Sequence, residues 1–430
     1  MSWANRSAAV ALAGGGAMLG WWLPRLERTY PSLGGFTYDS ATALATLSAI
    51  STGVITLFGL VLAATTIVVQ SVQAASPRLT GVLGYFERSL MLFGALAGTA
   101  LYALIVLTQI RPDFAPNLSV TLAVVFVLLS SAAILRSLAG LREMITGGGL
   151  VRAVAQQLHA VLDSEWTTHG THGPATASLF QPDESIELAV QRRGVVRRID
   201  SAALAAAAER IDAHVVCLIS TGTFVEPGTP ALQIITAAPA GQVDTARLLS
   251  ALHIGPSRRL DHDPAYGLRL LVDIALRALS PAVNDPTTAI QAIDRIESAL
   301  LRLARCPLGP TTHHDRTGVP RATINHPRWT DLLELALAEI TIRGATSLQV
   351  HRRLRFLLAT LTKHLPPDRL ESLTLYQDAL AHTARTFPTP ALTALAGQPD
   401  PQGLGAPAMP FRLPEPGPDG SGSAPDTPHG

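Results

Sequence analysis

Four stretches before residue 136 are long and apolar enough, or nearly so, to cross a lipid bilayer as helices. The hydrocarbon core of a bilayer is about 30 Å thick, so a spanning helix needs about 20 mostly apolar residues. The four windows cover residues 7–23, 47–70, 89–109 and 118–135, and the first is the shortest. The sequence therefore predicts an α-helical membrane protein with four transmembrane helices.

None of the four windows contains Asp, Glu, Lys, Arg or His. Ionisable groups inside a membrane usually mark proton or ion coupling, so their absence argues against a proton-coupled transporter. The first window also fits a signal peptide that starts at Arg6. However, Trp21, Trp22 and Arg25 are typical of an interfacial anchor, and no small-x-small cleavage site follows, which favours a membrane span.

Arginine is distributed unequally between the two sides of these windows. An excess of basic residues marks the cytoplasmic side, and here six arginines stand against three. The six are Arg6, Arg78, Arg88, Arg136, Arg142 and Arg152, and the three are Arg25, Arg28 and Arg111. With only two cysteines, as in reducing compartments, and a single lysine, the chain is expected in the bacterial cytoplasmic (inner) membrane with both termini cytoplasmic.

Small and weakly polar residues recur at three- and four-residue steps in the second window, which places them on one helix face. They are Ser48, Thr52, Thr56, Gly59, Ala63, Thr66 and Gln70. Such a face usually lets two membrane helices approach closely. The alternative is that Thr52, Thr56, Thr66 and Gln70 line a pore. The G-x-x-x-G spacings at Gly16/Gly20 and Gly94/Gly98 are likewise interpreted as packing positions.

The rest of the chain predicts a cytoplasmic α+β region. Residues 1–136 form the transmembrane domain, 137–182 a helical linker and 183–240 a small β-rich module resembling a barrel or sandwich. The strand period of Ile186, Leu188 and Val190 and the Pro227-Gly228 turn support that module. Residues 241–387 are expected to form a helical domain, and 388–430 a disordered Pro/Gly-rich tail.

Polar residues concentrate between residues 258 and 286. Asp263-Pro264 and Asp285-Pro286 are each typical of a helix N-cap followed by proline. Arg269, Asp273 and Arg277 lie four apart, which predicts either an intrahelical ion ladder or an arginine grip on an anion. The alternative to a ligand site is that the turn residues serve only in capping. The ligand-binding residues expected in this segment are Arg258, Asp263, Arg269, Asp273, Arg277, Asn284 and Asp285.

Three segments carry a resemblance to a known family: TTIVVQSVQAASPRL, TFVEPGTPAL and YGLRLLVDIALRALSPAVNDPTTA. Over residues 7–385 the chain resembles the bacterial predicted-membrane-protein family called domain of unknown function 2254. The resemblance implies four spans with a cytoplasmic C-terminal part and supplies no activity. Ala282 and Thr287 stand where the family pattern has glycine and an aromatic residue, and His262 stands for glutamine, which argues against a catalytic His262.

The sequence favours a membrane-anchored cytoplasmic module that binds a small anion or a protein partner. The alternative is an oligomeric channel or passive pore, and in either case a homo-oligomer in the lipid bilayer is expected. An enzyme with a site around residues 258–286 ranks last, because H-E-x-x-H, G-x-S-x-G, C-x-x-C and G-x-G-x-x-G motifs are all missing. We expect no cofactor, no metal and, at a net charge of +1, no nucleic acid.

Overall fold

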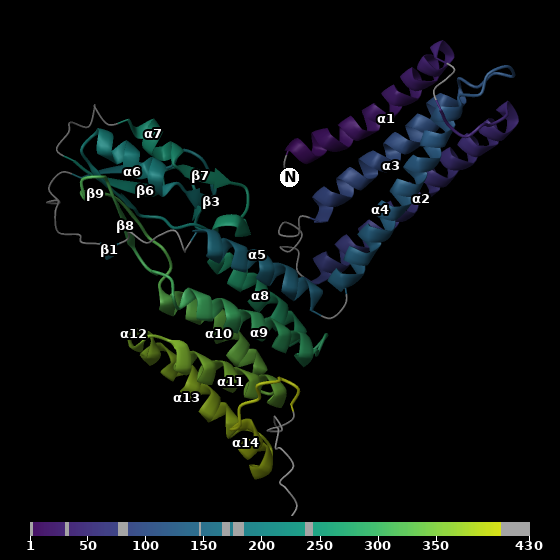
Figure 1. The fold of residues 1–430 in the computed structure, drawn as a ribbon. Helices are drawn as coiled ribbons and strands as arrows, with labels where there is room; N and C mark the ends of the chain where they lie inside the picture. The colour runs from purple at the N-terminus through teal and green to yellow at the C-terminus, as the bar shows by residue number, and fades with distance from the viewer. Residues whose placement is uncertain are drawn as a thin grey trace, which may run out of the picture.

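The computed structural model describes residues 3–30, 34–75, 85–145, 148–165, 173–174, 185–236 and 244–405. Within these ranges the chain forms three parts (Figure 1): a group of long N-terminal helices, a sheet module and a helical bundle. Of the residues named from the sequence, Arg78 and residues 406–430 lie outside the described part, as do the side chains of Arg88 and Arg142.

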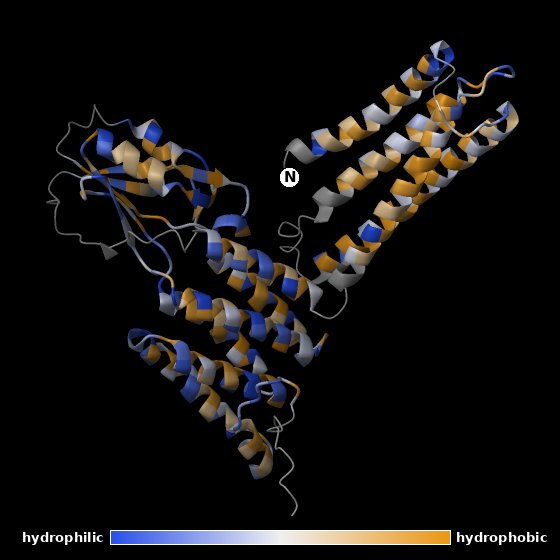
Figure 2. Cartoon of the chain, in the orientation of Figure 1, coloured by the Kyte–Doolittle hydropathy of each residue, from blue (hydrophilic) through white to orange (hydrophobic). Residues whose placement is uncertain are grey.

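The N-terminal part consists of α1 (Trp3–Thr29), α2 (Ser40–Ala75), α3 (Tyr85–Leu107) and α4 (Asn117–Ile145). Three of its segments are long and apolar enough to cross a membrane, namely Ser40–Gln70, Leu90–Leu107 and Asn117–Gly140. Helix α1 is not among them, although four spans were predicted. Figure 2 shows the reason, since apolar residues run along α2, α3 and α4 whereas α1 is interrupted by paler, weakly apolar positions.

Helix α1 lies against α3 through glycine. A Cβ atom at Gly16 would collide with the carbonyl oxygen of Gly98, and one at Gly20 would lie 2.9 Å from the carbonyl oxygen of Tyr102. Both G-x-x-x-G pairs are therefore packing positions, as predicted. At the far end of α1, the buried carboxylate of Glu27 accepts hydrogen bonds from the Leu118 N–H (3.0 Å) and the Ser119 N–H (2.8 Å), so α1 caps the first turn of α4.

The small-residue face of α2 points outward. Its buried face includes instead Ala43, Leu47, Val54 and Val61, which pack in the two cores of the N-terminal helices, and the buried Val68. All seven residues of the predicted stripe, from Ser48 to Gln70, are exposed. Among the described residues, this face of α2 therefore does not pack against another helix of the same chain. Thr56 and Thr66 donate hydrogen bonds to the carbonyl oxygens of Thr52 and Leu62 in their own helix.

The sheet module contains two sheets. The six-stranded sheet has the order β1-β8-β9-β4-β6-β2, and the three-stranded sheet has the order β5-β3-β7. The first sheet is formed by β1 (Gly173–Pro174), β2 (Ser185–Ala189), β4 (His214–Cys217), β6 (Pro230–Ile235), β8 (Thr311–His314) and β9 (Pro320–Ile324), and the second by β3 (Gly194–Ile199), β5 (Phe224–Val225) and β7 (Leu252–Gly255). Helices α6 (Ser201–Arg210) and α7 (Thr245–Ser250) complete the module.

This module differs from the one expected at 183–240. Strands β8 and β9 come from beyond residue 310, and β9 pairs with β4 as a parallel neighbour at Val215↔Ala322. Each strand order has two ends, so among the described residues neither sheet closes into a barrel. The core of the module gathers Val196, Leu204, Val215, Leu232 and Ile234, all of them fully buried.

The helical bundle has one continuous core. It contains α5 (Gly149–Glu165), α8 (Pro264–Ala278), α9 (Pro286–Leu303), α10 (Trp329–Gly344), α11 (Leu348–His364), α12 (Pro367–Leu370) and α13 (Thr374–Ala384). Helix α5 lies in the segment predicted to be a linker, yet its Val154 and Leu158 are fully buried in this core. The helical part therefore begins immediately after the membrane helices, since α4 ends at Ile145 and α5 begins at Gly149.

The sequence predicted a disordered tail from residue 388, whereas the structure describes a helix and turns up to residue 405. Helix α14 (Pro390–Ala396) and the turns up to residue 405 are ordered, and we call residues 390–405 the C-terminal strap. Asp400 is fully buried and accepts hydrogen bonds from the N–H groups of Gln402, Gly403 and Gly405. The guanidinium of the equally buried Arg352 donates to the carbonyl oxygens of Gln398 and Gly405. These charge-assisted hydrogen bonds stabilise the strap, which has little apolar surface to bury.

Candidate functional site

The polar residues singled out between 258 and 286 lie at opposite ends of α8. Arg258 and Asp263 precede the helix, whereas Asn284 and Asp285 follow it. Because α8 has 15 residues, its ends are about 22 Å apart at about 1.5 Å per residue. The structure therefore does not bring the seven predicted ligand residues into one site.

At the first end, Arg258 and Asp263 form a close ion pair. The guanidinium Nε and a terminal nitrogen of Arg258 each lie 2.9 Å from Oδ2 of Asp263. The other carboxylate oxygen caps α8 by accepting from the N–H of Tyr266, whose ring lies under the guanidinium. Burial raises the pKa of Asp263, and the neighbouring Arg258 acts in the opposite direction.

Along α8, the predicted ion ladder extends to a second helix. Arg269 Nε lies 2.7 Å from Asp273 Oδ1, and the same guanidinium pairs with Glu339 of α10. Arg277, two turns after Arg269, is exposed. The Arg269 side chain is thus occupied with joining α8 to α10, which favours the structural interpretation of these three residues.

At the second end of α8, Asn284 and Asp285 build a turn. Asn284 adopts a left-handed backbone with φ of 46°, a conformation that asparagine tolerates well. Asp285 caps α9 by accepting from the N–H of Thr288 at 3.0 Å. Both residues are therefore used in chain reversal and capping.

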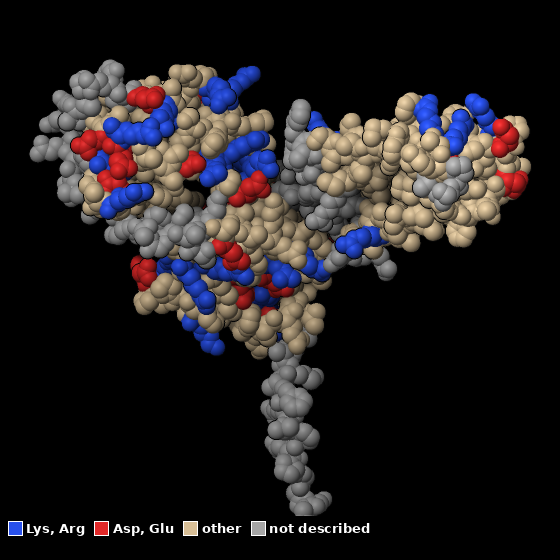
Figure 3. Space-filling view, turned by 45° about the horizontal axis from the view of Figure 1, so that its top comes forward, with Lys and Arg blue, Asp and Glu red and all other residues tan. Residues whose placement is uncertain are grey.

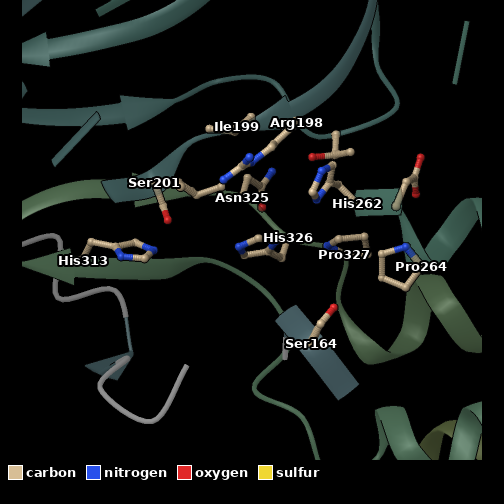
Figure 4. A pocket seen from close by; sticks show the side chains of 13 residues that line it. Ser164, Arg198, Ile199, Ser201, His262, Pro264, His313, Asn325, His326 and Pro327 are labelled. Carbon is tan, nitrogen blue, oxygen red and sulfur yellow. The ribbon is translucent and has the colours of Figure 1, made fainter. Parts of the chain in front are cut away.

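A cavity of about 240 Å³ lies where the sheet module meets the start of α8. Its walls come from β3, α6, β8, the segment after β9 and the end of α5, and they are rich in hydrogen-bonding side chains. Figure 4 shows His262, His313 and His326 around this space with Arg198 and Asn325 on its upper side. The polar lining consists of Ser164, Arg198, Ser201, Thr221, His262, Asp263, His313, Asn325 and His326.

Only Asp263 among the seven predicted ligand residues lines this cavity. His262 was considered from the sequence and argued against as a catalytic residue. His313, His326 and Asn325 went unrecognised, because they lie far from Asp263 in the sequence, on segments in or beside β8 and β9. His313 and His326 did give a weak signal, since both lie in short polar segments in or next to strands.

The fixed charges around the cavity are nearly balanced. Helices α6 and α8 begin at its wall, at Ser201 and Pro264, and the partial positive charge of each N-terminus faces a capping carboxylate, that of Asp200 or Asp263. Arg198 lies 3.6 Å from Asp200, and Arg258 pairs with Asp263. Among the described residues, no three His, Cys, Asp or Glu side chains are placed to hold a metal ion. The lining is thus suited to hold an oxyanion through N–H and O–H donors.

Comparison with known proteins places this architecture in context. A family model described as "Predicted membrane protein (DUF2254)" matches residues 2–360. The uncharacterized proteins Mb1321c of Mycobacterium bovis and Rv1290c of Mycobacterium tuberculosis are each 37% identical over 124 residues, which is 29% of this chain. The match spans about a quarter, 24%, of the length of these relatives. No solved structure matches the chain.

Proposed function

The chain belongs to the DUF2254 family of predicted membrane proteins, and from this premise we propose that it is a membrane-anchored cytoplasmic module that binds a small anionic ligand. The ligand site is the cavity between the sheet module and the start of α8. The bound anion would regulate what the module does at the membrane, either directly or through a protein partner.

The proposed anchor has four spans, with α1 as the fourth. Hydropathy alone leaves α1 out, but its glycines bring it into backbone contact with α3, and Glu27 caps α4 from its far end. Because the backbone of α1 packs directly against that of the membrane helix α3, we expect α1 to lie in the same bilayer. With four spans, the arginine excess puts both termini in the cytoplasm of a bacterial cell with the protein in its inner membrane.

The observation that carries the proposal is the convergence of polar side chains around one cavity. Arg198, three histidines and Asn325 border a space of about 240 Å³ beside the starts of two helices, which is enough for a phosphate-sized or somewhat larger anion. Each partner alone is ordinary at a protein surface. Their convergence from β3, β8, α6 and α8 is what a preorganised anion site requires.

The test uses the full-length protein in detergent with inorganic phosphate as the probe. Phosphate at constant ionic strength is expected to raise the melting temperature, because a ligand that binds only the folded state stabilises it by RT ln(1 + [L]/Kd). Arg198→Gln and His326→Gln should each reduce this stabilisation. His382→Gln, an exposed histidine on α13, is the matched control and should keep it. Equal stabilisation of all four proteins contradicts the cavity site.

The outward α2 stripe supports a second candidate function, an oligomeric pore. Thr52, Thr56, Thr66 and Gln70 are exposed on one membrane helix, and several copies arranged around these faces would enclose a weakly polar lumen. Purified protein in planar bilayers should then conduct ions, and Thr56→Trp should change the conductance more than Ile55→Trp on the neighbouring face. Folded protein that gives silent bilayers excludes the pore.

A further inference from the structure

The outer surface of the three-stranded sheet combines arginines with an exposed aromatic ring. We call this surface, made by Arg197 and Phe224 together with Arg192 and Arg193 in the loop at the edge of the sheet, the basic sheet face. Phe224 is 62% exposed and lies opposite Val195 of β3, while the next residues along each strand, Val225 and Val196, face the core at 1% or less exposure. Arg192 and Arg193, in the loop before β3, are exposed.

The arginines of this face are partly fixed in place. Arg197 Nε donates to the carbonyl oxygen of Ser257 at 3.0 Å, and its guanidinium lies where a side chain at Gly255 would be. Glu226, two residues after Phe224 in the sequence, is the one acidic residue in segments 191–199 and 223–226. A fourth arginine of these segments, Arg198, pairs with Asp200. The other three arginines against one carboxylate leave two positive charges at this edge of the module.

The basic sheet face lies on the flank of the module that is turned toward the membrane helices. Figure 1 shows β3 and β7 on the side nearest the N-terminal end of α1, whereas β8 and β9 lie on the opposite side. In Figure 3, basic side chains gather on this near flank. The soluble region follows α4 almost directly, since α5 begins at Gly149, which holds the module close to the bilayer.

We propose that the basic sheet face docks on the anionic lipid headgroups of the leaflet at which the soluble region emerges. Arginines attract acidic headgroups, and an aromatic ring is favoured at the membrane interface. Because the chain is already anchored in the same bilayer, the lipid headgroups are present at a high effective concentration. A small basic face is therefore enough for docking. The inference uses the membrane anchoring of the proposed function but not its ligand, so phosphate binding and docking fail or succeed separately.

Hydrogen exchange of the full-length protein in lipid nanodiscs tests the docking. Amides of segments 190–194 and 222–226 should exchange more slowly in discs enriched in phosphatidylglycerol than in zwitterionic discs, and high salt should remove the difference. Each arginine contributes about fivefold to such attraction, so Arg192→Gln with Arg193→Gln should lower the docked-to-undocked ratio by roughly 25-fold. Phe224→Ser should also weaken protection while leaving the salt dependence intact.

The matched control is Arg210→Gln with Arg316→Gln, two exposed arginines of the same module away from β3. This variant should keep the lipid-dependent protection. Equal exchange in both kinds of disc overturns the proposal, as does protection that the Arg192/Arg193 variant retains. Protection that depends on protein concentration instead of lipid charge assigns the face to contacts between copies and likewise overturns it.

Discussion

At the scale of single residues, His351 shows how the fold favours the neutral state of a buried histidine. The ring is fully buried, with Nδ1 3.1 Å from the carbonyl oxygen of Ala396 and Nε2 2.9 Å from that of Leu380. The edge of its ring contacts Phe387, and Arg355 on its own helix is the nearby cation. Burial, with Arg355 adding to it, lowers the pKa of His351, although the carbonyl contacts oppose this.

This lowered pKa predicts acid lability of the helical bundle. An unfolded histidine has a pKa of about 6.5, so protons bind the unfolded state more readily than the folded one. Stability is then fully present above about pH 6.5 and decreases as the pH falls through that value, by at most about 1.4 kcal/mol per pH unit for one histidine. Thermal unfolding followed by tryptophan fluorescence between about pH 8 and pH 5, a range set by histidine titration, measures it.

A substitution isolates the contribution of His351. His351→Gln should flatten the pH dependence of the melting temperature, whereas His382→Gln at an exposed site should not. Burial also lowers the pKa of His214, so some slope remains in the His351 variant. An unchanged slope would show that His351 is already charged in the folded state.

Several residue roles were predictable from the sequence and others were not. The Asp-Pro pairs at 263 and 285 gave both helix caps, because capping depends on neighbours close in the chain. The partner of Arg269 on α10 and the trans-capping role of Glu27 depend on contacts 70 and 91 residues away. No local pattern encodes those contacts, and the same holds for the cavity histidines.

At the scale of elements, the contact of α1 with α3 depends on the absence of side chains. Gly16, Gly94 and Gly98 all lie where a Cβ atom would meet the backbone of the other helix. At two neighbouring glycines, Gly14 and Gly15, an added Cβ atom would have nothing within 4 Å. One helix therefore carries both crowded and open glycines.

This difference predicts opposite effects of the same substitution. Gly16→Ala should lower the stability of the membrane part by about 1–3 kcal/mol, since backbone cannot yield to a new methyl group. Gly15→Ala should be neutral or stabilise by up to about 1 kcal/mol, because alanine is the better helix former. Unfolding in mixed detergents, monitored by circular dichroism, compares the two variants. Equal loss in both would mean that α1 does not use this face.

Element types were predicted better than their partners. The two helices that begin after Asp263 and Asp285 and the alternating strand after residue 185 follow from period and capping. The placement of β9 beside β4, across more than 90 residues, required the tertiary structure. The C-terminal strap was misjudged because its composition is that of a disordered segment, whereas buried Arg352 and Asp400 bind its backbone.

At the scale of the whole molecule, the C-terminal strap closes the helical bundle. It covers α11 and reaches α9, where Gly403 lies against Ile290. It also lies beyond residue 360, where the family match ends. The strap thus lies outside the matched residues, and Arg352 and His351 within the match bind its carbonyl oxygens.

Truncation separates the strap from the residues that follow it. A chain that ends at residue 387 should lose stability in the helical bundle, because it leaves buried Arg352 and His351 without their carbonyl partners in the strap, at about 1–3 kcal/mol for each unsatisfied group. A chain that ends at residue 405 should melt like the full-length protein. Melting temperatures of the two truncations provide the measurement, and identical values would contradict the role given to the strap.

The short junction between Ile145 and Gly149 also has a mechanical consequence. All the soluble elements after it hang from the end of one membrane helix, and α5 is embedded in the core of the helical bundle. A change in the tilt of α4 would therefore move α5, and the helical bundle built around it, relative to the bilayer. Because bilayer thickness influences helix tilt, we expect the position of the helical bundle to depend on the lipid environment.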